Sequence, residues 1–336
     1  MYNITLNHAL LNNGYWHVHA KHLGPKMKSR NSIIELIRFL AALWVVYYHD
    51  MFFVANNTST HFSDGKISVD FFFMLSGLFF LKSYSYYKEK SVAKNFVAFS
   101  SKRLKAMGVA LPIGLVFSTI YFVLFPTNNY GTNFIFGYLW FIPAMFVALL
   151  FYFFVCKIKY TKVQIVVILG VVVACYILAF IFRQARIFSA FAGIGLGILI
   201  SKIPNVPLFE TNKTLSAILS FVLIALCILF AYLPKTHLWV ELTLIFVLFP
   251  AFLYLSKHFT ISIPIFNHLG KLSFGIYAMQ SVVRVFRDCK ILTNNIVLCS
   301  IIFALAILCM IADKLLAKVA LKKRKAIDNN TTSTTV

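Results

Sequence analysis

Acidic residues are scarce in this chain, and charged residues of either sign are fewer than a water-soluble protein carries. Asp and Glu number ten against 32 Lys and Arg, and all four types make up 12% of 336 residues, where soluble domains hold about a quarter. Hydrophobic residues account for 60%, which excludes an ordinary soluble domain. Six cysteines without closely paired spacing argue against a disulfide framework or a zinc site, so we expect no bound metal.

Long apolar runs occupy most of the chain. A helix needs about 20 apolar residues to cross a bilayer, and backbone in lipid must satisfy its own hydrogen bonds, which favours helices over open sheets. We therefore predict an all-α, polytopic membrane helix bundle of about ten transmembrane helices. The predicted spans are 33–54, 67–84, 106–126, 134–156, 163–182, 187–201, 215–233, 238–256, 272–288 and 295–313.

The net charge of +22 reflects membrane topology rather than nucleic-acid binding. If the N-terminus is inside, 24 of the 32 Lys and Arg fall in inside segments and seven at the outside, while Arg38 lies within the first span. The positive-inside rule then predicts that both termini are cytoplasmic. Anionic lipid at the inner membrane surface is the expected partner of this charge.

The chain divides into three parts. Residues 1–32 form a cytoplasmic N-terminal segment with an alternative start at Met27, residues 33–313 form one membrane domain, and residues 314–336 form a basic cytoplasmic tail. We expect the polar end after Lys325 to be disordered, and the long inside loop at about 83–105 to lie partly on the membrane surface. No internal repeat of the kind found in transporters is visible.

The first span carries an unusual set of ionisable residues. Arg38 and His49 are eleven residues apart, so they share one helix face about 16 Å apart along the axis. Glu35 precedes Arg38 by three residues, the spacing of an ion pair. Ionisable groups inside membrane spans usually mark functional sites. The structural alternatives are an arginine anchored at the inner boundary and a solvated histidine at the outer one.

A second carboxylate opens the next span. Asp70 begins the run of residues 70–77, at the outer end of its helix, and antiparallel neighbours joined by a short loop would bring it close to His49. A carboxylate bonded to one imidazole nitrogen leaves the other nitrogen available as a base. The structural alternative for Asp70 is a charge favoured by the helix dipole. Glu241 is a further carboxylate within the eighth span.

These residues, with others along the chain, resemble the motifs of the membrane acyltransferase-3 family, which includes bacterial surface-polysaccharide O-acetyltransferases. Two features depart from that family. Arg103 is flanked by Lys102 and Lys105 where two arginines are usual, and Gln280 replaces a common late histidine. The matching positions are Glu35, Arg38, His49, Asp70 to Phe73, Leu75 to Gly77, Tyr138 to Phe141, Arg186, Gly193, Leu269, Gly270, Ser273 and Tyr277.

The resemblance implies a multi-pass enzyme of the bacterial cytoplasmic (inner) membrane. It would move an acetyl group from cytoplasmic acetyl-CoA, its co-substrate, to a hydroxyl of a cell-surface polysaccharide or lipid-linked sugar. His49 would act as a general base or carry the acetyl group itself. The site residues implied are His49, Asp70 and Arg38 for catalysis, Arg103, Lys102, Lys105 and Glu35 for CoA, and Trp140, Tyr138, Arg186 and Glu241 for the acceptor.

A multi-span exporter or flippase of a lipid-linked sugar or small solute is the alternative function. Such a protein would also have many spans, a basic inside and few buried charges. The grouping of Arg38, His49 and Asp70 on the first two spans favours the transferase, as does the lack of an internal repeat.

Overall fold

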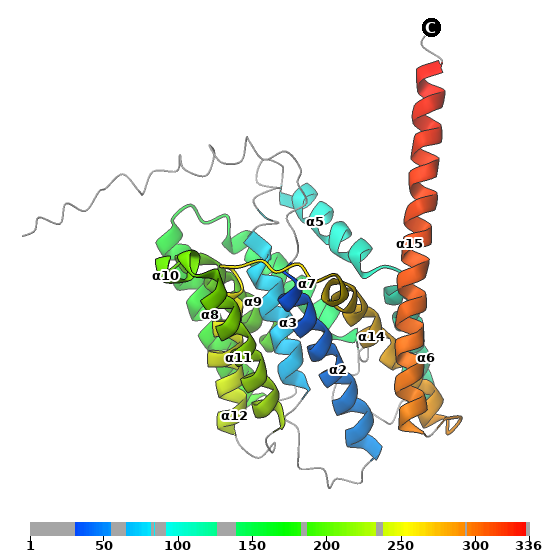
Figure 1. Ribbon diagram of the computed structural model, residues 1–336, viewed down its shortest axis with the longest axis horizontal. Coiled ribbons are helices and arrows are strands. Elements are labelled where there is room, and N and C mark those ends of the chain that lie inside the picture. Colours follow the sequence, from blue (N-terminus) through cyan, green and yellow to red (C-terminus); the bar gives the residue numbers. More distant parts are fainter. Residues whose placement is uncertain are drawn as a thin grey trace, which may run out of the picture.

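The computed structural model describes residues 31–54, 65–81, 84, 92–125, 139–182, 187–232, 238–292 and 294–333. Within these ranges the protein is helical and contains no strand, and a helix or helix pair matches each predicted span (Figure 1). The matching elements are α2 (Ser32–Val54), α3 (Lys66–Leu78), α6 (Ala110–Leu124), α7 (Phe141–Val155), α8 (Thr161–Ile181), α9 (Ile187–Lys202), α11 (Lys213–Tyr232), α12 (Leu238–Thr243) with α13 (Phe249–Leu255), α14 (Pro264–Asp288) and α15 (Asn295–Ser333).

The helices have the apolar surface of a multi-pass membrane protein. By length and hydropathy α8, α11 and α15 are each able to cross a bilayer, while α3, α7, α9 and α12 to α13 are shorter apolar helices. One face of α8 exposes Val166, Leu169, Val173 and Ile177, each more than half accessible. Such an outward apolar face suits lipid and would be unfavourable in water.

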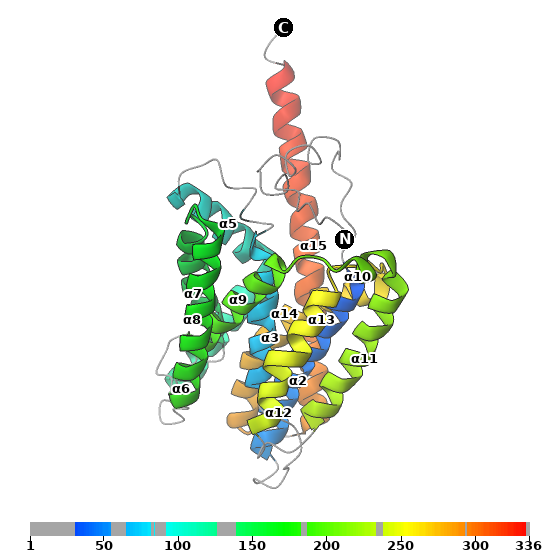
Figure 2. The ribbon, with the colours of Figure 1, turned by 90° about the vertical axis from the view of Figure 1, so that its left-hand side faces the viewer.

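Small residues allow α3 and α9 to pack closely. A side chain at Gly197 would overlap the backbone of Met74, and one at Gly77 would overlap the backbone of Ile194. Glycine at such positions brings two helix backbones together inside a membrane, where dispersion contacts replace the hydrophobic effect. Helix α9 therefore packs closely on α3, and its other side contacts α7 and α8 (Figure 2).

Helix α14 lies at the centre of the other half, packed against α2, α6 and α15. It begins at Pro264, eight residues before the predicted span, because proline is well suited to the first helical turn. Any side chain at Gly270 would overlap the carboxylate of Glu35, so α2 and α14 are in close contact near the starts of the two helices.

A sharp bend separates α5 (Val92–Met107) from α6. The two helices meet at 81°, and Gly108 in the bend has a φ of 62°, which glycine adopts without strain. The carboxylate of Asp313 accepts a hydrogen bond of 2.9 Å from the backbone N–H of Val109. The long loop expected at about 83–105 thus contains a helix that crosses the end of the bundle obliquely (Figure 1).

The last helix is longer than predicted. We expected a span ending near residue 313 and disorder after Lys325, but α15 continues to Ser333. The second prediction is wrong: residues 314–325 are rich in Leu, Ala and Lys, which are strong helix formers, and the helix continues from them through the more polar residues 326–333. The basic tail therefore projects from the bundle as a helix (Figure 1).

Candidate active site

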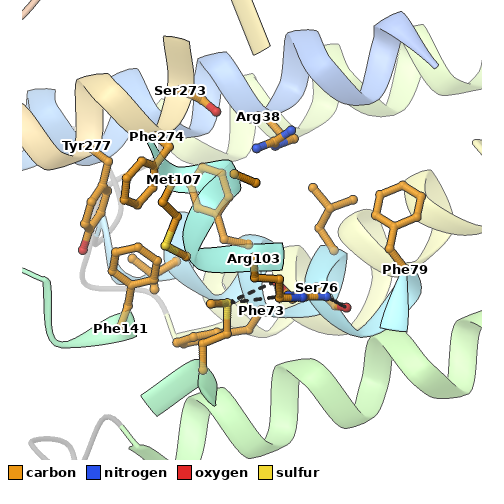
Figure 3. Close-up of a pocket in the computed structure, with 15 residues that line it drawn as sticks. Arg38, Phe73, Ser76, Phe79, Arg103, Met107, Phe141, Ser273, Phe274 and Tyr277 are labelled. Atoms are coloured by element: carbon orange, nitrogen blue, oxygen red, sulfur yellow. Dashed lines mark hydrogen bonds between the residues drawn. The ribbon is translucent and has the colours of Figure 1, made fainter. Parts of the chain in front are cut away.

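A cavity of about 270 Å³ lies inside the bundle where α2, α3, α5, α7 and α14 converge. Its walls are largely apolar, but the lining includes two arginines and three hydroxyl-bearing residues. Arg38 enters from α2, and Arg103 from α5 enters beside Ser76 of α3 (Figure 3). The lining residues are Arg38, Val69, Phe72, Phe73, Leu75, Ser76, Phe79, Arg103, Ala106, Met107, Phe141, Met145, Ser273, Phe274 and Tyr277.

Arg38 is held by the carboxylate predicted to pair with it. Its Nη1 donates to Glu35 Oε2 at 2.9 Å, while the Glu35 side chain is 9% exposed and the Arg38 side chain 30%. A short charge-assisted contact fixes the direction of the guanidinium. Glu35 is not part of the cavity wall, so its contact with the site runs through Arg38.

Arg103 has a different environment, without a carboxylate among the contacts described here. It donates to the backbone oxygen of Ser76 at 3.4 Å and lies 4.6 Å above the ring centroid of Phe99. Both contacts leave the positive charge uncompensated by an anion. Lys102 and Lys105, the other predicted CoA ligands, are exposed and do not line the cavity.

Asp70 lies apart from this cavity. It is 2% exposed, and its backbone oxygen approaches Gly193 of α9. Gly65 lies against Tyr48, so Asp70, five residues further along α3, lies about 7.5 Å deeper in the bundle. The side chain of His49 is outside the described part of the structure, and its pairing with Asp70 stays a prediction.

Of the motif residues Tyr138 to Phe141, Phe141 lies in the cavity wall, although we did not name it as a site residue. Trp140 packs its ring against Phe73, with centroids 6.1 Å apart, whereas Phe141 lines the cavity and meets the ring of Tyr277 at 4.5 Å. Tyr138 and Arg186 lie outside the described residues. Glu241 lies in α12, half-buried and away from the cavity wall.

Most other lining residues were also missing from our predicted site, among them Ser76, Tyr277 and Met145. Ser76 and Tyr277 were each noted only as part of a family motif. Met145 lies near Ser76 Oγ, with its sulfur 3.6 Å away, yet an isolated methionine in an apolar helix carries no sequence signal.

The fold and the cavity define a class, a multi-pass helical membrane protein with cationic groups inside the bundle. The comparison with protein families then gives the family. The acyltransferase-3 family, described as "Acyltransferase domain", matches residues 31–313. The chain belongs to this family. No curated protein and no solved structure matches the chain. The resemblance derived from the sequence motifs is therefore confirmed, and the protein is a membrane acyltransferase.

Proposed function

We propose that the protein is an O-acetyltransferase of the bacterial cytoplasmic membrane, which moves an acetyl group from cytoplasmic acetyl-CoA to a hydroxyl of a cell-surface or lipid-linked sugar. One observation carries the proposal: in a chain of an acyltransferase family, Arg38 and Arg103 converge from two helices on one largely apolar cavity. Cations at the mouth of an apolar cavity match a donor that is anionic at one end and uncharged at the other.

The donor's charge supports the assignment of the two arginines. CoA carries phosphates, which arginine binds with paired hydrogen bonds. Arg103 lies on α5 at the end that the charge distribution predicts to be cytoplasmic, and Arg38 is near the start of α2. Lys102 and Lys105 are exposed on the same helix, where they would attract the phosphates from solution.

The size of the cavity supports a short acyl group. At about 270 Å³ it is at or below the small end of the range of pockets that hold drug-sized ligands, about 300–1,000 Å³. The rings of Phe141 and Tyr277 close part of the apolar wall. This space suits the end of a pantetheine arm and an acetyl group better than a long fatty chain.

For the chemical step we assign His49 of α2 the role of base that the family resemblance implies. An imidazole nitrogen removes the proton of the acceptor hydroxyl, the hydroxyl oxygen attacks the thioester carbonyl, and the C–S bond breaks. The imidazolium then returns the proton to the departing thiolate, so CoA leaves as a thiol. An acetyl-imidazole that accumulates without acceptor would instead make His49 the nucleophile.

The experiment compares surface-glycan O-acetyl content by NMR, before and after mild base, in cells with wild-type protein, His49→Ala, or no copy of the gene. We expect the acetyl signal to disappear equally in the last two. Equal acetyl content in wild-type and deletion cells, together with lipid-linked sugar accumulating inside, would instead favour an exporter or flippase.

A further inference from the structure

Helix α14 carries a row of buried polar residues that continues beyond the cavity. Ser273, Tyr277, Gln280 and Arg284 are spaced by four, three and four residues, so they share one helix face. Each is at most 6% exposed. Ser273 and Tyr277 line the cavity, whereas Gln280 and Arg284 extend the row toward the end of the bundle predicted to be outside.

The row reaches the height of His49. Glu35 of α2 and Gly270 of α14 touch near the starts of the two helices, and both helices run from there toward the predicted outer side (Figure 1). Fourteen residues further on, about 21 Å along each axis, α2 reaches His49 and α14 reaches Arg284. The neighbouring helix therefore brings a guanidinium to the level of the proposed base.

Arg284 lies further from the carboxylate of Asp288 than the two neighbouring residues that bind it. Its Nε is 3.5 Å from Asp288 Oδ2, longer than the 2.7–2.9 Å of a strong charge-assisted bond. The same carboxylate accepts shorter hydrogen bonds from Arg287, at 3.0 Å, and from the Tyr121 hydroxyl, at 2.8 Å. Asp288 is thus bound mainly by these two residues, although Arg284 also lies 5.3 Å above the Tyr121 ring.

Gln280 gives an independent indication of a ligand. Its residue is 5% exposed, and its Nε2 has no hydrogen-bond partner within the described part of the chain. A buried amide donor without an acceptor destabilises the folded protein, and a bound acceptor atom would remove that cost. It lies one helical turn before Arg284, on the side of the cavity.

We propose that Gln280 and Arg284 bind an anionic oxygen group, phosphate or carboxylate, of the acceptor, and so hold an acceptor hydroxyl beside His49. This inference rests on the transferase function proposed above. Arg38 and Arg103 face the donor about 16 Å away along the helix axis, by the eleven residues between Arg38 and His49. The two substrates thus bind at opposite ends of the bundle. The arginines at one end bind the donor, and the amide of Gln280 with the guanidinium of Arg284 binds the acceptor at the other.

The experiment measures binding of two small anions, inorganic pyrophosphate and glucuronate, to the purified full-length protein by isothermal calorimetry, with glucose as the neutral probe. We expect wild type to bind at least one anion but not glucose, and Arg284→Gln to bind it at least about tenfold more weakly. Each of these proteins also carries Arg38→Gln and Arg103→Gln, which together remove pyrophosphate binding at the donor end. Lys290→Gln, which removes an exposed charge at the same end of α14, should bind like wild type.

The pattern of binding identifies the source of the anion. Pyrophosphate binding that depends on Arg284 indicates a diphosphate-linked lipid, and glucuronate binding indicates an acidic sugar. Equal binding by wild type and Arg284→Gln overturns the proposal. If Arg284→Gln does not fold, Gln280→Glu gives a second test, because a carboxylate there should repel either anion and weaken binding.

An acetyl-transfer assay of proteins that retain Arg38 and Arg103 separates this inference from the transferase function. If wild type binds an anion through Arg284 but transfers no acetyl group from acetyl-CoA to membrane glycans, the anion site is supported and the transferase function is overturned. Wild type that transfers acetyl while Arg284→Gln keeps an unchanged KM for the acceptor would retain the function and lose the site.

Discussion

Two cavities of nearly equal size lie on different faces of the same pair of helices, α2 and α3. The first, of about 270 Å³, contains Arg38 and Arg103. The second, of about 280 Å³, is lined by apolar residues such as Leu40, Trp44 and Ile228 together with Tyr47, Cys227 and the hydroxyl of Ser68. Concavity is therefore common to both, and only the first contains charge, which is costly inside a membrane. Charge placement, more than volume, distinguishes the candidate active site from the second cavity.

Among the substitutions that remove charge from the first cavity, loss of the Arg38 guanidinium should lower acetyl transfer most. We expect Arg38→Ala to lower acetyl transfer about 100-fold, because it removes a charge-assisted contact with the donor phosphates in a partly buried site. The measurement is transfer of radiolabelled acetyl from acetyl-CoA to glycan in isolated membranes. Lys162→Ala, which removes an exposed basic side chain at the start of α8, is the control. Equal activity of both variants would contradict a role for Arg38.

Arg103 should act mainly on donor binding. We expect Arg103→Gln to raise the KM for acetyl-CoA about tenfold, because it loses a charge-assisted contact with phosphate, while kcat changes less. Arg103→Lys should recover only part of the affinity, since an ammonium lacks the planar fork of arginine. Initial rates at varied acetyl-CoA test this, and a pure fall in kcat would place Arg103 at the reacting atoms instead.

Substitution of Glu35, which contacts the cavity only through Arg38, should lower acetyl transfer by a smaller factor. Glu35→Gln keeps the side-chain volume and removes the 2.9 Å ion pair with Arg38, so we expect a loss of about fivefold, in line with a partly exposed pair. The same substitution in Arg38→Ala should cost nothing further, because the two residues act as a unit. An additive loss in the double variant would give Glu35 a role of its own.

The sequence predicted the features that depend on local spacing. The helices follow from apolar runs, and the Glu35–Arg38 contact follows from an i, i+3 spacing. The cavity depends on distant contacts, which periodicity cannot reveal. Arg103 is directed inward because Gly108 bends the chain by 81° and Asp313, more than 200 residues away, caps that bend. Tyr277 forms part of the wall because Gly270 lets α14 approach α2.

A tryptophan placed in each cavity should affect acetyl transfer very differently. In the second cavity we expect the smallest effect of all these substitutions, and in the first a complete loss. Ile228 lines the second cavity and is 54% exposed, so Ile228→Trp can occupy that space from its rim without strain in the core. We expect transfer to fall by less than about twofold, as for surface changes away from a site. Met107→Trp fills the first cavity and should abolish transfer. A matched loss in a stably folded Ile228→Trp protein would mean that the apolar cavity also holds a substrate group, such as the hydrocarbon of a lipid-linked acceptor.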